Sequence, residues 1–204
     1  EPETLVRADR LDDEAVRLAH GEAKAGLIEE VRARTGRALD PDLPILGFAR
    51  RMTGYKRPDL LFSDLDRLRS LAGRLPFQVV LAGKAHPNDG GGKELIRRIG
   101  EHARALAGEV PVVFLPGYDM ALAARLVPGC DVWLNTPLPP LEASGTSGMK
   151  AALNGVLNLS VLDGWWIEAC EEDVTGWAVD DPARTEPEGH ARLLYDKLEK
   201  VVLP

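Results

Sequence analysis

The sequence predicts an α/β fold in which a parallel sheet carries helices on both faces. Short runs of continuous apolar residues alternate with amphipathic segments, which is typical of parallel strands buried on both sides. The 204 residues are 45% hydrophobic and 28% charged, which is ordinary for a globular chain with enough apolar material for a core. Polar clusters follow the apolar runs, where ligands bind in such sheets. The expected architecture is therefore Rossmann-like.

The elements follow one another in a regular order. Apolar residues at helical spacing predict a long amphipathic helix over residues 12–35 that ends at Gly36. The run ILGFAR then predicts the first buried strand, and Pro58 suits the first turn of the helix that comes next. Further strands are predicted over residues 77–85, 110–118, 131–137 and 156–163, and further helices over residues 93–108, 120–127, 149–155 and 189–203.

Composition and charge limit the classes of function. We divide the chain into an N-terminal helix with its linker, residues 1–40, and a Rossmann-like domain, residues 41–204. A formal net charge of -7 argues against nucleic-acid or anionic-membrane partners, which need an excess of Lys and Arg. Cys130 and Cys170 lack CxxC spacing, and no signal-like apolar N-terminus is seen, so a reduced, cytoplasmic protein is expected. No metal site is predicted, because the histidines are scattered: His20, His86, His102 and His190.

Polar segments follow four of the predicted strands. Because the carboxyl ends of parallel strands share one edge of a sheet, we expect these segments to converge there. They span residues 50–58, 83–93, 117–119 and 135–150.

The first polar segment concentrates positive charge in an acidic chain. Phosphate recognition uses both the planar fork of Arg and the compact charge of Lys. A phosphate site is one interpretation of the cluster, and a solvated basic face is the other. Its cations are Arg50, Arg51, Lys56 and Arg57.

The segment EASGTSGMK, residues 142–150, precedes a predicted helix. Its small residues leave backbone N–H groups accessible at the positive end of the helix dipole, which suits an anion. Capping of the helix by Thr146 or Ser147 is the alternative, and both can hold together. Solvation alone does not explain Lys150, since a lysine beside fixed positive charge loses its proton more readily and can become a Schiff-base nucleophile.

Two further segments are less informative. PNDGGGKE, residues 87–94, matches neither G-x-x-x-x-G-K-[ST] nor G-x-G-x-x-G, and we interpret it as a flexible loop. His86 before it is expected to be an ordinary loop residue at the functional edge. Trp165 and Trp166 precede an acidic run and suit either a sugar-binding platform or, more often after a strand, a plug in the core or a domain interface.

Together these segments resemble the C-terminal domain of the α-glucan phosphorylases, which act on glycogen and maltodextrin, in their short bacterial form. EASGTSGMK resembles the family's cofactor-lysine motif E-A-S-G-T-G-N-M-K, and GFARRMTGYKR resembles its phosphate-site motif. LAGKAHP and FLPGYDMALAARLVPGCD follow in the family's order and spacing. The resemblance covers most of the chain, from about Leu11 to near its end.

The resemblance assigns roles to residues. Lys150 would bind the cofactor pyridoxal 5'-phosphate covalently as an imine, and the turn before it would let the backbone approach two phosphates. The implied catalytic residues are Lys150, Arg51, Lys56 and Thr146, and the implied cofactor-binding residues are Lys150, Gly145, Thr146, Ser147, Arg50 and Tyr118. The implied substrate-binding residues are Glu142, for a glucose hydroxyl, Ala143, Ser144 and Gly145, for the sugar pocket, and Arg51 and Lys56, for inorganic phosphate.

The reaction implied by the resemblance is phosphorolysis. Inorganic phosphate would release the terminal α-1,4-linked glucose of an α-glucan as glucose 1-phosphate with retention, and the cofactor would act through its phosphate group. The family folds as two Rossmann-like domains, as some glycosyltransferases do, with the active site between them. This chain would supply the second domain, so we expect it to be inactive without the N-terminal domain. A homo-oligomeric parent protein is compatible with the resemblance.

Three positions depart from the longer family members, and two other functions stay open. Asp119 stands where many have Arg, Arg50 where many have Lys, and Ser147 and Gly148 replace Gly-Asn. A nucleotide-sugar-dependent glycosyltransferase would use the acidic and basic groups for ribose and diphosphate, but it does not need Lys150. A non-enzymatic glucan-binding or regulatory domain would use the two tryptophans instead.

Overall fold

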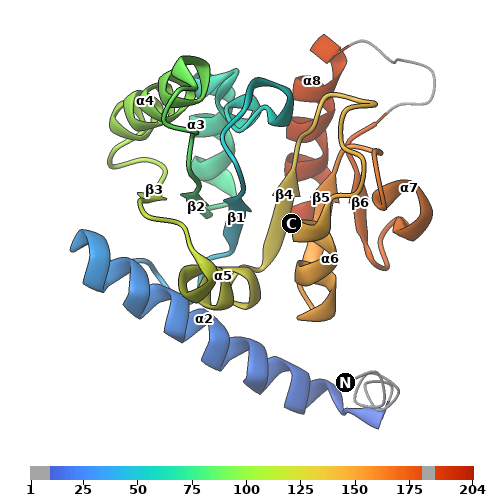
Figure 1. The fold of residues 1–204 in the computed structure, drawn as a ribbon. Helices are drawn as coiled ribbons and strands as arrows, with labels where there is room; N and C mark the ends of the chain where they lie inside the picture. Colours follow the sequence, from blue (N-terminus) through green and yellow to red (C-terminus); the bar gives the residue numbers. More distant parts are fainter. Residues whose placement is uncertain (1–9, 181–186) are drawn as a thin grey trace.

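The structure, a computed structural model, describes residues 10–180 and 187–204. In that part of the chain, six parallel strands form one sheet in the order β3-β2-β1-β4-β5-β6 (Figure 1). The predicted α/β fold with a parallel sheet is confirmed. The strands are β1 (Ile45–Ala49), β2 (Gln78–Ala82), β3 (Val112–Leu115), β4 (Val132–Asn135), β5 (Leu157–Ser160) and β6 (Gly176–Ala178).

Strand β1 shows why the strands are apolar along their whole length. All five of its residues are buried, and successive side chains point to opposite faces of the sheet. Leu46 and Phe48 belong to one apolar cluster, whereas Ile45 and Ala49 belong to a second. Each side chain of β1 therefore packs into one of the two apolar clusters, and a polar side chain in this strand would disrupt the cluster on its face.

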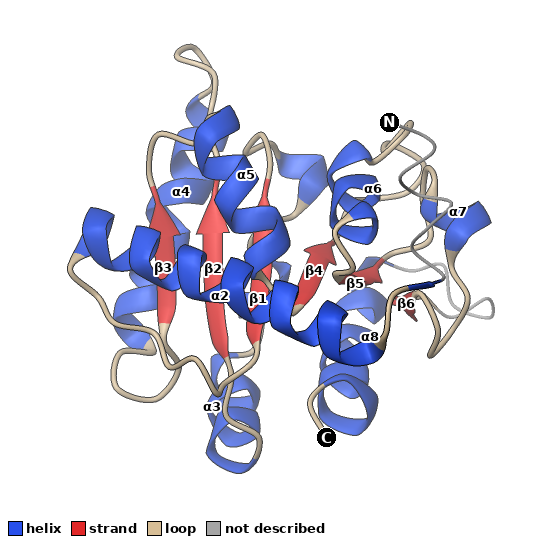
Figure 2. Ribbon diagram, turned by 90° about the horizontal axis from the view of Figure 1, so that it is seen from below, coloured by secondary structure: helices blue, strands red, loops and turns tan. Residues whose placement is uncertain are grey.

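Helices cover both faces of the sheet, as Figures 1 and 2 show. The first apolar cluster is completed by residues of α3 (Leu65–Arg74), α4 (Gly90–Ala105) and α8 (Pro187–Lys197). The second is completed by residues of α2 (Asp13–Thr35), α5 (Met120–Gly129) and α6 (Thr146–Leu153). Short elements complete the described fold: η2 (Gly54–Lys56), η3 (Leu60–Phe62), the one-turn helix α7 (Trp166–Ala169) and the π-helical turn η4 (Leu198–Val202).

The long first helix is confirmed, with Gly36 at its end as predicted. Gly36 has a φ of 70° and donates its N–H to the carbonyl of Arg32, which satisfies one of the last carbonyls of α2. The C-terminal half of α2 is held against the domain by buried Leu27 and Val31. Its first turns extend past α6 in Figure 1, and Val16 is 47% exposed there.

Two predictions about helix starts were wrong. Pro58 does not lie in the first turn of an α-helix, because it precedes η3 and α3 begins only at Leu65, with Asp64 as its N-cap. The glycines at residues 90–92 are not a flexible loop, because they form the first turn of α4. The Asp89 carboxylate accepts the Gly92 N–H at 2.8 Å, and this cap gives the helix a defined start despite its glycines.

One strand and one α-helix were not predicted. β6 contains three residues and α7 contains four. Neither is long enough to display the alternation or helical spacing from which elements are inferred. Tertiary pairing supplies what the local sequence lacks, since Gly176 and Trp177 pair with Asn158 and Leu159 of β5.

The strand order positions the site. The chain passes from β1 outward to β2 and β3, then returns to place β4 on the other side of β1. The segments that leave β1 and β4 therefore diverge at the carboxyl edge. Such a point of reversal leaves a crevice, and ligands of doubly wound sheets bind there.

Candidate active site

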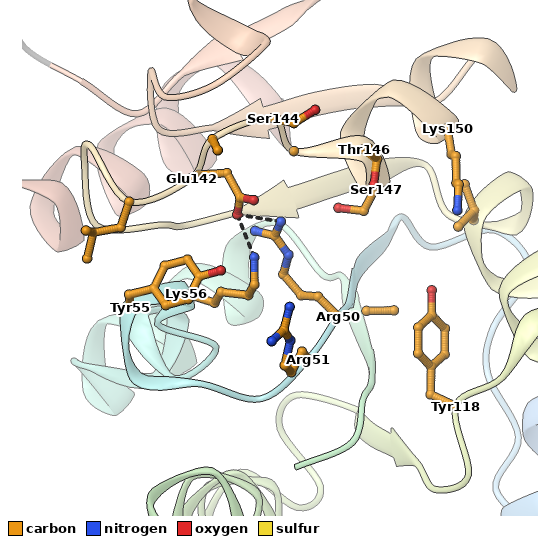
Figure 3. A pocket seen from close by; sticks show the side chains of 15 residues that line it. Arg50, Arg51, Tyr55, Lys56, Tyr118, Glu142, Ser144, Thr146, Ser147 and Lys150 are labelled. Atoms are coloured by element: carbon orange, nitrogen blue, oxygen red, sulfur yellow. Dashed lines mark hydrogen bonds and ion pairs between the residues drawn. The ribbon is translucent and has the colours of Figure 1, made fainter. Parts of the chain in front are cut away.

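A pocket of about 440 Å³ lies at this point of reversal (Figure 3). Its wall brings together every residue to which the family resemblance assigns a catalytic, cofactor or substrate role. They are Arg50, Arg51, Lys56, Tyr118, Glu142, Ala143, Ser144, Gly145, Thr146, Ser147 and Lys150. The sequence reasoning missed Ala49, Tyr55, Val127 and Leu141, which also line it. Tyr55 could have been found, since it lies beside Lys56 in the same short loop.

The basic loop after β1 rests on the loop after β2. The N–H of Arg50 donates to the carbonyl of Ala82, and that of Met52 donates to the carbonyl of Lys84. A Cβ at Gly83 would lie 2.3 Å from the carbonyl oxygen of Arg50, so only glycine allows this approach. Three of the four polar segments that we expected to converge line the pocket. The fourth, residues 83–93, does not line it, but the backbone around Lys84 supports the basic loop.

Glu142 joins two cations inside the pocket. Its Oε2 lies 2.6 Å from Nη2 of Arg50 and 2.8 Å from Nζ of Lys56. The three side chains are only 11%, 8% and 7% exposed, respectively, so water screens this ion triad weakly. Lys56 also lies over the ring of Tyr55, 4.6 Å from its centroid. Both contacts fix the side chain of Lys56 at the wall (Figure 3).

Arg50 is not satisfied by this ion pair. Its Nε and Nη1 groups are buried and have no hydrogen-bond partner among the residues that the structure describes. Burial lowers the pKa of its guanidinium, against the opposing charge of Glu142, yet arginine keeps its proton in proteins. An unsatisfied buried donor costs roughly 1–3 kcal/mol. Two such donors on a buried cation at a pocket wall fit an anionic ligand such as a phosphate group.

The other two arginines of the loop differ. Arg51 is exposed, lines the pocket, and has no ion-pair or hydrogen-bond partner in the described ranges. Arg57, which the sequence grouped with the phosphate cluster, points away from the pocket. It donates to the carbonyls of Thr136 and Pro137, and its Nη2 lies 2.8 Å from Nδ1 of His190. These contacts fasten the loop to the segment after β4. The backbone of Arg57 has a φ of 43°, and this left-handed conformation directs its side chain there.

The segment before α6 presents backbone donors. Gly145 is the N-cap with a φ of 88°, a conformation that favours glycine, and no side chain of the described residues caps the helix. The predicted cap by Thr146 or Ser147 is not formed, since the Ser147 hydroxyl instead donates to Oδ1 of Asn135 at 3.3 Å. The first N–H groups of a helix lack intrahelical partners. They lie at the pocket wall, where the helix dipole favours an anion.

Lys150 and Tyr118 lie on the side of the pocket opposite Tyr55 and Lys56, with Arg50 between the two groups (Figure 3). The Lys150 side chain is exposed and is one turn into α6. Burial raises the pKa of the Tyr118 hydroxyl, so this group is a neutral donor near pH 7.

The departure at Asp119 has a structural explanation. Asp119 is the N-cap of α5, and its carboxylate accepts the N–H of Leu122 at 2.8 Å. This backbone hydrogen bond lowers the pKa of Asp119. The carboxylate is not part of the pocket wall, so it does not offset the positive charge of Arg50 directly.

The tryptophans do not line the pocket. Trp166 is 1% exposed, and Trp165 is half-buried against the turn before α6. The interpretation as a plug therefore fits better than a sugar platform.

Other classes of site find no support in the described part of the chain. Within residues 10–180 and 187–204, no three His, Cys, Asp or Glu side chains are grouped to hold a metal ion. Cys130 and Cys170 are free thiols. None of the described helices combines the length and apolar character needed to cross a membrane.

Gly148→Ala is expected to destabilise the fold at the site. An added Cβ would lie 2.8–2.9 Å from polar atoms of Asn135, Asn158 and Trp165, so α6 or these side chains must shift. We expect the free energy of unfolding to fall by about 1–3 kcal/mol, as overpacking does. Urea unfolding followed by circular dichroism measures it. Gly21→Ala in α2 is the matched control, because no atom of the described residues lies within 4 Å of the added Cβ. It should stabilise by up to ~1 kcal/mol, and equal effects of the two changes would contradict the packing argument.

The fold and the pocket together define a class: a doubly wound α/β domain with a cationic pocket at its point of reversal. Comparison with known proteins narrows the class. A family model described as carbohydrate phosphorylase matches residues 6–176, and the chain belongs to that family.

Named relatives agree with this family. The chain is 51% identical to a glycogen phosphorylase of Aquifex aeolicus over 176 residues, which cover 83% of this chain and 25% of the relative. It is 41% identical to a maltodextrin phosphorylase of Thermococcus litoralis over 216 residues, covering 96% of this chain and 26% of the relative. A glycogen phosphorylase of Mycobacterium tuberculosis is 40% identical over 230 residues, covering all of this chain and 26% of the relative. The chain thus spans about a quarter of the length of these curated relatives.

Proposed function

We propose that this chain carries the cofactor and phosphate half of the active site of a pyridoxal-phosphate-dependent α-glucan phosphorylase. The observation that carries the proposal is buried Arg50, whose Nε and Nη1 lack partners among the described residues, in one pocket with Lys150. Membership of the carbohydrate phosphorylase family supports it. So do the names of the relatives, which are glycogen and maltodextrin phosphorylases.

The residues fit pyridoxal phosphate. Lys150 provides the only lysine amine on its side of the described pocket wall, and it is exposed enough to react. The Arg50 donors, which lack a partner among the described residues, and the first-turn N–H groups of α6 suit the cofactor's phosphate. Bound there, the cofactor would supply a second phosphate group, whose chemistry would be proton exchange. The holding residues would be Lys150, Arg50, Tyr118, Gly145, Thr146 and Ser147.

The remaining groups suit the substrates. Arg51 and Lys56 would bind inorganic phosphate, with Arg51 free to move because it has no partner in the described ranges. Glu142 would accept a hydrogen bond from a glucose hydroxyl. The turn at residues 143–145 would line the sugar pocket, since it exposes little side chain.

Electrostatics explains why the pocket is so cationic. Phosphorolysis brings two phosphate groups close together, and their mutual repulsion must be offset as charge moves between them. Fixed cations and helix N–H groups do this without reorganising, and their effect is largest where water is excluded. Arg50 and Lys56 are buried and paired through Glu142, so their charges are already in position. The thermodynamic direction of the reaction is set by the substrates and not by these groups.

The test of the proposal uses Arg51→Ala in the complete polypeptide that contains this chain. Each charge-assisted hydrogen bond lost is expected to cost roughly 1.5–3 kcal/mol, so kcat/KM for inorganic phosphate should fall about 10- to 150-fold. The KM for maltodextrin should change far less. The measurement is formation of glucose 1-phosphate with each substrate varied in turn.

Two results would contradict this assignment. Equal losses for phosphate and glucan would indicate a structural arginine. Activity that requires a nucleotide sugar and ignores phosphate would indicate the glycosyltransferase alternative. Arg69→Ala is a suitable control and should leave both constants unchanged. Arg69 lies on α3 and pairs with Asp66 of the same helix and with Glu109 in the segment after α4, away from the pocket wall.

A further inference from the structure

The segment after β5 contacts the turn that carries Glu142, although the proposed function gives it no role. We propose that Asp163 and Trp165 are positioning residues that clamp this turn and the start of α6 in the geometry that binds ligand. The inference rests on the proposed function for what the turn binds. The clamp itself rests on contacts between residues 163–165 and residues 142–148. Residues 163–165 do not line the pocket.

Asp163 holds the turn through its carboxylate. The side chain is 7% exposed, and its Oδ2 accepts the N–H of Glu142 at 2.8 Å. Its Oδ1 accepts the N–H of Gly164 at 2.9 Å. Each oxygen thus has its own backbone donor, so the carboxylate cannot rotate without losing one bond. A charged acceptor makes these hydrogen bonds stronger than bonds between neutral groups.

The backbone of the next two residues holds the same turn. The N–H of Trp165 donates to the carbonyl of Ser144 at 2.9 Å. Gly164 has a φ of 57°, and a Cβ there would lie 2.6 Å from the carbonyl oxygen of Ser144 and 2.8 Å from that of Glu142. The two backbones therefore touch directly, and only glycine at residue 164 allows this.

The ring of Trp165 supports the start of α6. A Cβ built on Gly145 would lie 3.0 Å from its Cδ1, and one built on Gly148 would lie 2.9 Å from its Nε1. Trp165 is half-buried and does not line the pocket. The ring thus fills the space beneath the turn and fixes the position of the first-turn N–H groups. This gives the tryptophan a role that is neither a sugar platform nor part of the main core.

The clamp acts on the ligand site through Glu142. The backbone of Glu142 is held by Asp163, and its side chain holds Arg50 and Lys56. A shift of that backbone therefore moves the one acceptor that both buried cations share. The chain of contacts runs from Asp163 to the phosphate-binding groups in two steps, without contact between Asp163 and the ligand.

Asp163→Asn in this chain tests the clamp. Asn offers one acceptor oxygen where Asp offers two, so either Glu142 or Gly164 faces an NH2 group. We expect the Glu142 amide to exchange its proton at least about tenfold faster, and the affinity for pyridoxal phosphate to fall roughly tenfold or more. Amide exchange by NMR measures the first, and fluorescence titration with pyridoxal phosphate measures the second. Asp64→Asn is the control, since the Asp64 carboxylate also accepts one backbone N–H, of Arg67 at 2.9 Å, but on α3.

A second variant separates positioning from folding. Trp165→Phe keeps an aromatic ring and the backbone bond to Ser144, so Glu142 should stay protected while the affinity for pyridoxal phosphate falls. If folded Asp163→Asn protein kept wild-type exchange at Glu142 and wild-type affinity, the clamp would be refuted. If the unchanged chain bound no pyridoxal phosphate, the proposed function would fail instead. The exchange rate of the Glu142 amide would still decide the clamp in that case.

Discussion

Lys150→Ala is expected to abolish the covalent retention of pyridoxal phosphate by this chain. Lys150 is exposed at the wall of the pocket that also holds the Arg50 donors without a partner among the described residues, so we expect the amine and these donors to act on one cofactor molecule. The variant should still bind the cofactor's phosphate weakly through Arg50. After borohydride reduction and dialysis, the absorbance of the reduced cofactor should remain with the unchanged chain and disappear from the variant.

Lys84→Ala is the matched control for this experiment. Lys84 is exposed at the same edge of the sheet, does not line the pocket, and uses its backbone carbonyl to bind Met52. Its replacement should leave retention unchanged. Retention by Lys150→Ala at the level of the control would show that the cofactor reacts with surface lysines alone.

Arg50→Met is expected to have the second largest effect. Methionine keeps much of the side-chain volume and removes all the donors, so the phosphate group loses charge-assisted hydrogen bonds worth ~1.5–3 kcal/mol each. The affinity for inorganic phosphate should fall about 10- to 150-fold. Glu142 keeps Lys56 as a partner, so the free energy of unfolding should fall by only about 1–3 kcal/mol. Calorimetric titration with phosphate and urea unfolding measure the two quantities.

Arg67→Met controls for the loss of a paired arginine elsewhere. Arg67 lies within 3.0 Å of both Asp196 and Glu199, outside the pocket wall. Its replacement should lower stability without changing phosphate affinity. If Arg50→Met lost stability but bound phosphate as tightly as the unchanged chain, the donors of Arg50 would serve the fold alone.

The sequence predicts the architecture well, because a strand that is buried on both faces of the sheet must be apolar along its whole length. A strand such as β1 must be apolar at every position, and the polar residues that follow it must lie at the carboxyl edge. Chain order and this one rule were enough to bring Arg50, Glu142 and Lys150 into a single pocket. The roles of these residues stay predictions.

Individual side-chain directions were beyond the sequence. Arg57 lies one residue from Lys56, yet a left-handed backbone conformation turns it toward Thr136 and His190. In the sequence, nothing distinguishes Asp163 from other acidic residues that follow a strand. Its carboxylate accepts the N–H of Glu142, which is 21 residues away in sequence. Such effects depend on tertiary contacts between segments and leave no local pattern. The helix start at Gly90 was missed for a local reason, because three successive glycines disfavour a helix until Asp89 caps them.

Peptide mapping of the reduced protein tests most directly whether Lys150 is the point at which the cofactor is held. The chain is saturated with pyridoxal phosphate, reduced with borohydride, digested and analysed by mass spectrometry. Lys84, Lys93 and Lys200 are also exposed and serve as internal comparators. We expect the pyridoxyl group almost entirely on Lys150, and addition of inorganic phosphate should reduce labelling there by competing for Arg50. Equal labelling of Lys150 and the three exposed comparators would contradict a cofactor site in this pocket.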